Sequence, residues 1–437
     1  MAGAALTLLA ERLAALPPGV VWVGYSGGLD STVLLHMLAA LPAARQRGLH
    51  ALHVCHGLHP DAEHWVRHCA VFSAALGVPF QSVGVTVSSI AEEGLEAAAR
   101  RARHAAFAQY VPAPGTLALA HHQDDQAETL LLRLLHGAGH EGLAGMRTLR
   151  PLRRDDAARW LWRPLLDVPR AVLADYARDH ALDVIDDPGN ADPRFIRNRV
   201  RHGALPALSA VFPDATARIA AAAQRMREEA DALDAVALDL LQRHHDAATR
   251  SLACEPLRTS PPALARRLVG AWLDANGLPR PPSGIWARLV PELVDARRDA
   301  TPVLAWHGAR LRRHRDRLYG DRGTLDASAD WTLAWNGMAP LPLPNGAGAL
   351  AFEPALAAPA RFLVRPRQGG ESLRLGGHHR AVKKLLQDAG LPPWQRDALP
   401  LVFDAQGQLL SVAARWNNDG FSQQMAQTGT RLLLRHD

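Results

Sequence analysis

The chain has 437 residues, of which 48% are hydrophobic and 21% charged, a balance typical of soluble globular proteins. Its length predicts two to four domains, because single cores seldom grow beyond about 300 residues. No apolar run reaches about 18 residues, so no transmembrane helix and no membrane partner are expected. The 3 cysteines include no CxxC pair, which excludes a disulfide framework and a thiolate zinc site and favours the reducing cytoplasm. A net charge of +6 permits a polyanionic partner but does not prove one.

Strand-like and helix-like segments alternate in the first part of the chain. The strand-like runs are Val20–Tyr25, Leu49–Val54, Phe80–Val85 and Leu117–Ala120. The helix-like stretches between them are Ser31–Ala40, Ala62–Leu76 and Leu95–Tyr110. This alternation predicts parallel strands joined by right-handed crossovers, which is a doubly wound α/β sheet. Ligands of such sheets bind at the carboxyl ends of the strands.

The remaining chain reads as helices followed by mixed structure. Apolar residues recur at helical spacing from Pro213 to about His245, and shorter helices are expected over Pro262–Ala275 and Ile285–Ala296. An arginine-rich β-hairpin is expected over 303–320, and the Pro/Gly/Ala-rich stretch 336–360 reads as a boundary that could carry short strands. The tail, with one helix near 381–389, reads as a small α+β domain. We therefore expect four segments, at 1–212, 213–335, 336–360 and 361–437.

A glycine turn follows the first predicted strand, in the sequence SGGLDS formed by Ser26, Gly27, Gly28, Leu29, Asp30 and Ser31. Glycines allow close approach of a ligand, and the N-terminus of the next helix favours an anion. Asp30 would repel a bare phosphate, but it is sensible if Mg²⁺ lies between carboxylate and phosphates. A Walker loop is excluded because no lysine follows the turn. The structural alternative is a strand–helix turn in which Asp30 is only the helix cap.

A second cluster, AHHQDDQAET, spans residues 120–129 where another strand should end and a helix begin. Asp125 and Glu128 are three residues apart and share one helix face, where carboxylates could bind an amine, deprotonate it or hold magnesium. The structural alternative is a capping box with Asp125 at the cap and Glu128 three residues later. Between the two clusters, Arg100 and Arg103 share a helix face, either as solvated arginines or as a clamp on phosphate or nucleic acid.

The motifs SGGLDS, HVCHGLH, ARRAR and AHHQDDQAET, in this order and spacing, resemble those of the tRNA(Ile)-lysidine synthetase family within the PP-loop ATP pyrophosphatase superfamily. The later segment DDPGNADPRFIRNRVRHGALPAL, at 186–208, and the tail after Val364 are also similar to this family. The resemblance implies a PP-loop (adenine nucleotide α-hydrolase-like) domain, a mainly helical middle domain and a small α+β C-terminal domain. His59 and His104 depart from the family's usual arginine and aromatic residue at those positions.

The family converts the wobble cytidine of a CAU anticodon to lysidine with ATP and L-lysine, which changes decoding from AUG to AUA. Carried over, residues 26–31 would bind ATP with Asp30 near Mg²⁺, Asp125 and Glu128 would handle the incoming lysine, and Arg100 and Arg103 would lie near the phosphates or the cytidine. The implied tRNA contacts are Arg197, Asn198, Arg199, Arg201, Arg365, Arg367, Lys383, Lys384 and Arg396. A monomer or a homodimer is implied.

Three other functions compete with this interpretation. A PP-loop tRNA thiolase commonly carries CxxC pairs, which this chain lacks. A glutamine- or ammonia-dependent ligase of the same superfamily would not need a basic C-terminal domain. A non-enzymatic RNA-binding protein explains the arginines but leaves Asp30, Asp125 and Glu128 without a role.

Overall fold

A computed structural model describes residues 2–57, 59–88, 94–153, 156–297, 300–322, 331–344 and 348–435. The chain divides into two compact units, Met1–Val236 and Ala237–Asp437. No helix in the described ranges is long and apolar enough to cross a membrane.

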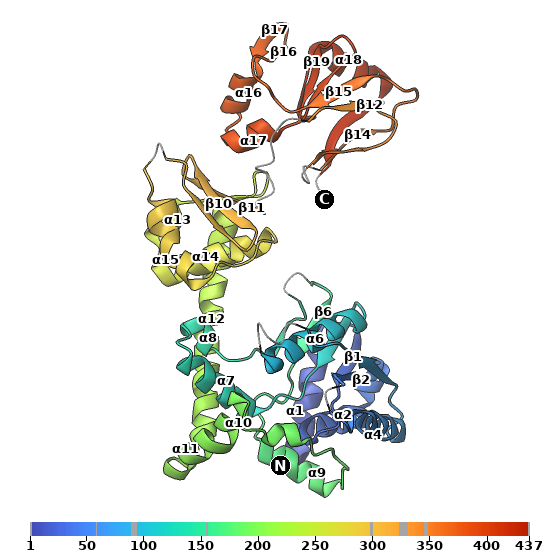
Figure 1. The fold of residues 1–437 in the computed structure, drawn as a ribbon, viewed down its shortest axis with the longest axis vertical. Helices are drawn as coiled ribbons and strands as arrows, with labels where there is room; N and C mark the ends of the chain where they lie inside the picture. The colour runs from blue at the N-terminus through green and yellow to red at the C-terminus, as the bar shows by residue number, and fades with distance from the viewer. Residues whose placement is uncertain are drawn as a thin grey trace. The chain divides into compact units, whose positions relative to one another are not determined.

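A six-stranded sheet forms the centre of the first unit, in the order β3-β2-β1-β4-β6-β5 (Figure 1). Neighbouring strands run parallel except for the edge pair β5 and β6, which is antiparallel. The doubly wound sheet is therefore confirmed, although the fourth strand begins and ends two residues earlier than predicted. The strands are β1 (Val20–Gly24), β2 (Leu49–Cys55), β3 (Phe80–Gly84), β4 (Gly115–Ala118), β5 (Leu149–Pro151) and β6 (Arg159–Trp162).

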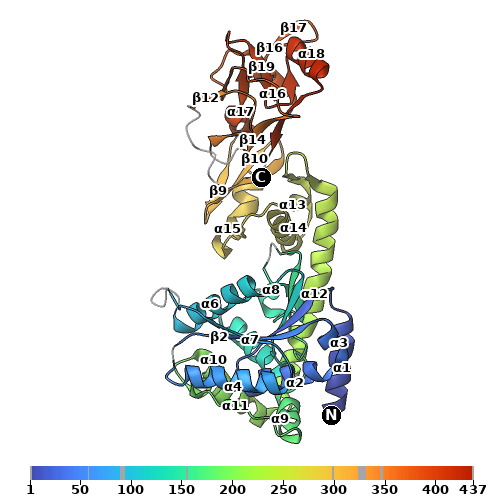
Figure 2. The ribbon, with the colours of Figure 1, turned by 90° about the vertical axis from the view of Figure 1, so that its right-hand side faces the viewer.

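Helices cover both faces of this sheet because successive residues of its buried strands point to opposite sides. Val21 and Val23 of β1 pack into a core formed with α1 (Ala2–Ala14), α2 (Leu29–Ala40), α4 (Ala62–Ala75) and α9 (Arg170–Asp179). Trp22 packs on the other side, in a core that includes Phe107 of α6 (Leu95–Tyr110). Figure 2 shows α2 and α4 on one face and α6 on the other. A short helix, α3 (Pro42–Gln46), precedes β2.

Shorter helices follow the sheet strands in the same unit. The helix α7 (Gln123–Leu135) begins directly after the loop that leaves β4, and α8 (His140–Leu143) follows it. A 3₁₀ turn (Pro188–Ala191), α10 (Ile196–Arg199), a π-helical turn (Val200–Ala204) and α11 (Leu205–Val211) then lead into α12. The long helix predicted from Pro213 to His245 is confirmed as α12 (Ala215–His244).

The middle part of the chain is mainly helical, as expected, and its helices are combined with a second sheet. The sheet order is β7-β8-β11-β10-β9, and its buried side packs Leu252, Leu311 and Leu318 against Trp272 of α14 (Pro262–Ala275). The segment 303–320, predicted as one hairpin, instead contains three antiparallel strands, β9 (Val303–Trp306), β10 (Ala309–His314) and β11 (Arg317–Asp321). Other elements are β7 (His245–Asp246), β8 (Ser251–Ala253), α13 (Glu255–Thr259), α15 (Ser283–Arg288) and a π-helical turn (Leu289–Val294).

The C-terminal part contains a five-stranded sheet, a three-stranded sheet and a hairpin. Within the predicted boundary 336–360, residues 345–347 lie outside the described ranges, whereas β14 (Ala349–Glu353) pairs with the last strand, β21 (Arg431–Arg435). The domain limits expected from the sequence, at 1–212, 213–335, 336–360 and 361–437, remain predictions. The other elements are β12 (Leu333–Trp335), β13 (Leu341–Pro342), β15 (Phe362–Arg365), β16 (Ser372–Leu375), β17 (His378–Ala381), β18 (Leu401–Phe403), β19 (Leu409–Val412), β20 (Trp416–Asn417), α16 (Val382–Asp388), α17 (Pro393–Ala398) and α18 (Asp419–Thr428).

Candidate functional site

The glycine turn joins β1 to α2 and ends at Gly28, which is the cap residue of the helix and provides no side-chain cap. Asp30 is therefore the second residue of the helix, and the alternative that made it the cap is wrong. A carboxylate in the first helical turn is stabilised by the positive end of the helix dipole. Asp30 thus needs no capping role to be tolerated at this position, and its side chain remains available to the site.

The turn presents hydroxyl and backbone donors on the same short segment. The hydroxyl oxygens of Ser26 and Ser31 lie 3.0 Å apart, and the Ser26 N–H donates to Ser31 Oγ at 3.2 Å. Gly27 has a φ of +85°, a left-handed conformation that glycine adopts without strain. The first N–H groups of α2 have no partner within the helix. Such a turn can bind an anion of the size of a phosphate.

The helix α7 is capped by His122, not by Asp125. The His122 Nδ1 accepts from the Asp125 N–H at 3.4 Å, and the His122 N–H donates to Asp125 Oδ2 at 3.1 Å. The structural alternative, a capping box with Asp125 at the cap and Glu128 three residues later, is therefore wrong. The helix begins at Gln123, so the capping box is formed by His122 and Asp125. Glu128 lies in the second turn, has no capping duty and is 0% exposed.

The two clusters meet because β1 and β4 are neighbours in the sheet and both end at its carboxyl edge. The His122 Nε2 lies 3.6 Å from Asp30 Oδ2 and 3.4 Å from Asp125 Oδ2. Burial alone would lower the pKa of His122, but Asp30, Asp125 and Asp124 outweigh it and raise that pKa. The imidazole therefore connects the carboxylate of the glycine turn with that of α7.

Two arginines from the segment 197–201 face the carboxylates of α7. Arg201 Nε donates to Glu128 Oε1 at 2.5 Å, and Arg197 Nε donates to Glu128 Oε2 at 2.8 Å. Asp125 Oδ1 accepts from Arg201 at 2.9 Å and from Arg197 at 3.3 Å. Burial alone would raise the pKa of Asp125, but its histidine and arginine neighbours lower it. Two carboxylates and two guanidinium groups therefore form a charge-balanced, largely buried cluster.

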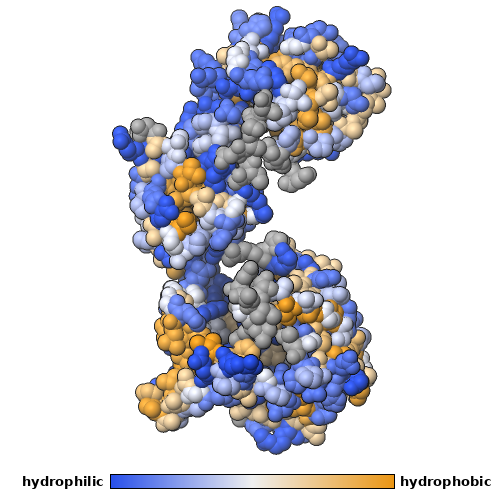
Figure 3. Space-filling view, viewed as in Figure 1, coloured by the Kyte–Doolittle hydropathy of each residue, from blue (hydrophilic) through white to orange (hydrophobic). Residues whose placement is uncertain are grey.

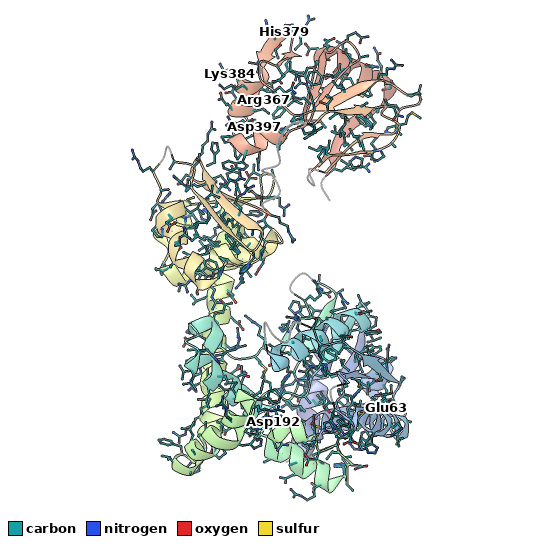
Figure 4. The ribbon with its side chains drawn as sticks, viewed as in Figure 1. Glu63, Asp192, Arg367, His379, Lys384 and Asp397 are labelled. Atoms are coloured by element: carbon teal, nitrogen blue, oxygen red, sulfur yellow. The ribbon has the colours of Figure 1, made fainter. Side chains whose placement is uncertain are left out.

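The four residues expected to contact tRNA in this segment differ in their surroundings. Arg199 is exposed, whereas Arg197 and Arg201 are occupied by Asp125 and Glu128. The Asn198 side chain is buried and donates to the Gly189 and Asp192 carbonyls, both at 2.9 Å. Asp192, labelled in Figure 4, also accepts from Arg194. In this structure only Arg199 of the four presents its charge to solvent.

Arg100 and Arg103 are exposed on α6 and belong to a positively charged region beside the sheet edge. Burial, followed by Arg100 and Arg103, lowers the pKa of His104 to about 4. Burial, followed by Arg150, Arg100 and Arg133, lowers the pKa of Arg163 to about 9. Arg163 Nε donates to Nδ1 of His121, in the loop between β4 and α7, at 3.2 Å. The region can stabilise negative charge that develops next to the glycine turn.

The C-terminal candidates also fall into two groups. Arg365 donates to Glu371 at 3.1 Å and stacks 4.4 Å from the Phe403 ring, and Arg396 donates to the Leu391 carbonyl at 2.6 Å. Arg367 lies 3.9 Å from Glu371 and 4.0 Å from Asp397. Lys383 and Lys384 are exposed on α16. Figure 3 shows hydrophilic surface over α16 and β17, and Figure 4 labels Lys384 and His379 there.

Sequence reasoning missed Arg170, at the start of α9. Its Nε lies 3.6 Å from Asp30 Oδ1, and its backbone N–H donates to Asp124 Oδ1 at 3.1 Å. No local pattern marks this residue, because it lies 140 positions after Asp30 and resembles any surface arginine. Only the folded chain brings it to the glycine turn.

Comparisons with known proteins agree with this geometry. Three family models match: a PP-loop domain at residues 6–208, a TilS substrate binding domain at 252–319 and a TilS substrate C-terminal domain at 362–434. The tRNA(Ile)-lysidine synthase of Xanthomonas axonopodis pv. citri (strain 306) is 45% identical over 401 residues, covering 90% of this chain and 89% of that protein. The tRNA(Ile)-lysidine synthase of Xylella fastidiosa (strain Temecula1) is 45% identical over 405 residues, covering 90% of each chain.

The parallel sheet, its glycine turn and the adjacent carboxylates define a PP-loop enzyme that uses ATP. The chain belongs to the tRNA(Ile)-lysidine synthase family. It is therefore an ATP-dependent ligase that acts on tRNA, and the tRNA thiolase alternative is not favoured.

Proposed function

We propose that the enzyme activates the wobble cytidine of a CAU-anticodon tRNA(Ile) with ATP and then joins it to L-lysine. The cytidine ring carbonyl oxygen attacks the α-phosphate and expels pyrophosphate. The lysine ε-amine then attacks the activated ring carbon, AMP leaves, and the amine loses a proton. The observation that carries this proposal is the meeting of the glycine turn and the α7 carboxylates, with Asp30 and His122 3.6 Å apart.

Residues 26–31 would hold the ATP phosphates through backbone N–H groups and the Ser26 and Ser31 hydroxyls. The Asp30 carboxylate fits a Mg²⁺ ion, because its buried Oδ1 has no hydrogen-bond partner among the described residues. No group of three or more His, Cys, Asp or Glu side chains in the described ranges could hold a metal. The remaining ligands would then be phosphate oxygens and water, as is common for Mg²⁺. The ion would neutralise charge on the leaving pyrophosphate.

Asp125 and Glu128 would bind the amino groups of lysine, and one of them would accept the proton that the attacking amine loses. In this structure Arg197 and Arg201 occupy the same oxygens, so lysine would compete with two guanidinium groups. Arg197 and Arg201 help to keep the Asp125 carboxylate ionised before lysine arrives, because an adjacent positive charge favours the charged form and lowers the pKa of Asp125. Arg197 and Arg201 would thus pair with Asp125 and Glu128 before lysine binds, and part of these contacts would be replaced by the amino groups of lysine.

The positive region near Arg100 and Arg103 would stabilise charge on the phosphates or the activated cytidine. Arg199, Lys383 and Lys384 present their charges to solvent and are the strongest candidates for tRNA phosphate contacts. The other proposed contacts already have protein partners and would have to exchange or share them: Arg197, Asn198, Arg201, Arg365, Arg367 and Arg396. We propose that the enzyme acts in the cytoplasm, where its three substrates occur, as a monomer or a homodimer.

The direct test incubates the purified enzyme with a tRNA(Ile) transcript, ATP, Mg²⁺ and radiolabelled L-lysine. Label should enter the transcript with a CAU anticodon, with one pyrophosphate and one AMP released per lysine. A transcript that differs only in having a GAU anticodon is the matched control and should take up none. Absence of label in the CAU transcript, or sulfur incorporation from a sulfur donor, would contradict the proposal.

A further inference from the structure

The carbonyl of Gly27 accepts two hydrogen bonds from two different parts of the first unit. The Thr32 hydroxyl, on the first turn of α2, donates to it at 3.0 Å. The backbone N–H of Ile185, in the segment after α9, donates to the same oxygen at 2.9 Å. Thr32 is 0% exposed, so its hydroxyl holds the carbonyl on the interior side of the turn.

The direction of this carbonyl determines the direction of the next N–H group. In a trans peptide the C=O and the following N–H point in opposite directions, because the unit is planar. With the Gly27 oxygen held inward, the Gly28 N–H must point away from the interior, toward the open side of the turn. Since Gly28 is the cap residue of α2, this N–H joins the donors at the helix N-terminus that can bind an anion. A rotation of this single peptide would instead present a carbonyl oxygen to the anion.

Packing beneath the turn prevents such a rotation. A Cβ atom added to Gly27 would collide with Ile185 Cδ1 and would lie 2.9 Å from the Cys69 sulfur. Cys69 is 0% exposed, and burial raises the pKa of its thiol to about 12, so it packs here as a neutral group. The turn is therefore fixed by two hydrogen bonds to the Gly27 carbonyl oxygen and by close packing around the Gly27 Cα atom.

We propose that Thr32 and Ile185 are positioning residues for pyrophosphate binding: they fix the Gly27–Gly28 peptide so that its N–H faces the ATP phosphates. Neither residue touches the substrate. The inference rests on the proposed function, since it takes residues 26–31 as the phosphate site. Ile185 also immediately precedes the segment that leads to Arg197 and Arg201, so the chain links the α7 carboxylate partners directly to the ATP turn.

The test compares Thr32→Val, which removes the hydroxyl at nearly constant volume, with Thr32→Ser, which keeps it. The Michaelis constant for ATP should rise about tenfold in Thr32→Val, the effect of losing one well-placed buried hydrogen bond. It should return to within about threefold of the unmodified enzyme in Thr32→Ser, since only a methyl group is lost. The Michaelis constants for tRNA and lysine should not change in either variant. An unchanged ATP constant in Thr32→Val, or an equal rise for all three substrates, would overturn the proposal.

Ser73→Ala is the control, one helical turn after Cys69 on α4. The Ser73 hydroxyl is buried without a hydrogen-bond partner among the described residues, so removing it should leave ATP kinetics unchanged. A rise equal to that of Thr32→Val would mean that any change beneath the turn has this effect, which contradicts a specific role for the Gly27 carbonyl. Equilibrium dialysis with labelled ATP gives a binding readout that does not depend on turnover.

Ile185→Val is a second variant, which removes only the Cδ1 methyl group that packs beside Gly27. ATP binding should weaken about twofold to fivefold, with the melting temperature within about 2 °C of the unmodified enzyme. Unchanged ATP binding here would remove Ile185 from the proposal. Failure of the proposed function looks different, because the unmodified enzyme would then incorporate no lysine before any variant is compared.

Discussion

Asp30 combines an unsatisfied oxygen with a nearby guanidinium group and a nearby imidazole. Its Oδ1 has no hydrogen-bond partner in the described ranges and lies 3.6 Å from Arg170 Nε, while its Oδ2 lies 3.6 Å from His122 Nε2. These distances are too long for hydrogen bonds, so the carboxylate lies close to both groups without being held by either. An acceptor left in this state costs stability, and it is best explained by a ligand that the site is built to take.

Asp30→Asn should reduce the rate of lysine incorporation at least a hundredfold while tRNA affinity changes less than about twofold. The amide keeps the shape of the side chain but loses the charge that a metal–phosphate complex requires. Pyrophosphate release under saturating tRNA measures the first effect, and filter binding measures the second. Asp179→Asn, at an exposed position on α9, is the matched control and should be indistinguishable from the unmodified enzyme. Retained activity in Asp30→Asn would disprove the metal role.

His104 shows how the arginines of α6 affect the stability of the fold. Its folded pKa of about 4 lies below the ordinary value of 6.5, because burial and neighbouring arginines disfavour its charged form. The unfolded chain therefore binds the proton more readily than the folded one between these values. The contribution of this group to stability is complete above about pH 6.5 and is lost as the pH falls through 4.

His104→Phe should make the enzyme less sensitive to acid. Between pH 7 and pH 5 its free energy of unfolding should fall less than that of the unmodified enzyme, because phenylalanine takes up no proton. Urea denaturation at the two pH values provides the measurement. The comparison variant is His64→Phe, at an exposed position on α4, which should keep the full pH dependence. Equal pH dependence in all three proteins would refute the buried, neutral state of His104.

At the scale of elements, α7 illustrates both the strength and the limit of the sequence. The position of the helix and the shared face of Asp125 and Glu128 are readable from spacing alone. The cap is not, because a histidine side chain is an unusual N-cap and aspartate is the commoner choice. With the cap at His122, Asp125 is the third residue of the helix and Glu128 takes no part in capping it. The catalytic interpretation of Glu128 is stronger in the structure than in the sequence.

The pairing of α7 with the segment 197–201 could not be predicted. Arg197 and Arg201 lie 72 and 76 positions from Asp125, and an arginine-rich segment is read first as a surface for nucleic acid. Their ion pairs depend on how α10 and its π-helical turn pack against α7, which no local pattern specifies. By contrast, the meeting of the two clusters at the sheet edge could be predicted, because strand alternation alone places the loops after β1 and β4 at the same end of the sheet.

Glu128→Gln should destabilise the first unit by about 3 kcal/mol, because it leaves two largely buried guanidinium groups with a single carboxylate. It should also abolish lysine transfer while ATP still binds. Urea denaturation measures the stability, and equilibrium dialysis measures ATP binding. Glu63→Gln, at the exposed position labelled in Figure 4, makes the same chemical change and should alter stability by less than about 0.5 kcal/mol. A stability change below about 1 kcal/mol in Glu128→Gln would contradict the charge-balanced cluster.

At the scale of the whole chain, the residues proposed for the chemistry and the two lysines lie in different units. The first unit contains every residue proposed for the chemistry, and the second contains the only two lysines in the protein, adjacent and exposed on α16. Exposed adjacent cations gain little from intramolecular pairing in water, whereas the phosphates of a polyanion would pair with both. This division predicts that changes on α16 alter tRNA binding and its salt dependence without altering the chemical step.

Lys383→Ala combined with Lys384→Ala should weaken tRNA binding about tenfold at moderate salt and leave the rate at saturating tRNA unchanged. Each lost phosphate contact should also reduce the slope of log affinity against log salt by about one. Filter binding from 50 to 200 mM salt measures both quantities. The matched control combines Arg361→Ala with Arg431→Ala, which removes the same charge from exposed positions in the same region. If the control pair reduces the slope equally, net charge rather than contact by α16 determines binding, and an unchanged slope in the lysine pair would remove α16 from the tRNA interface.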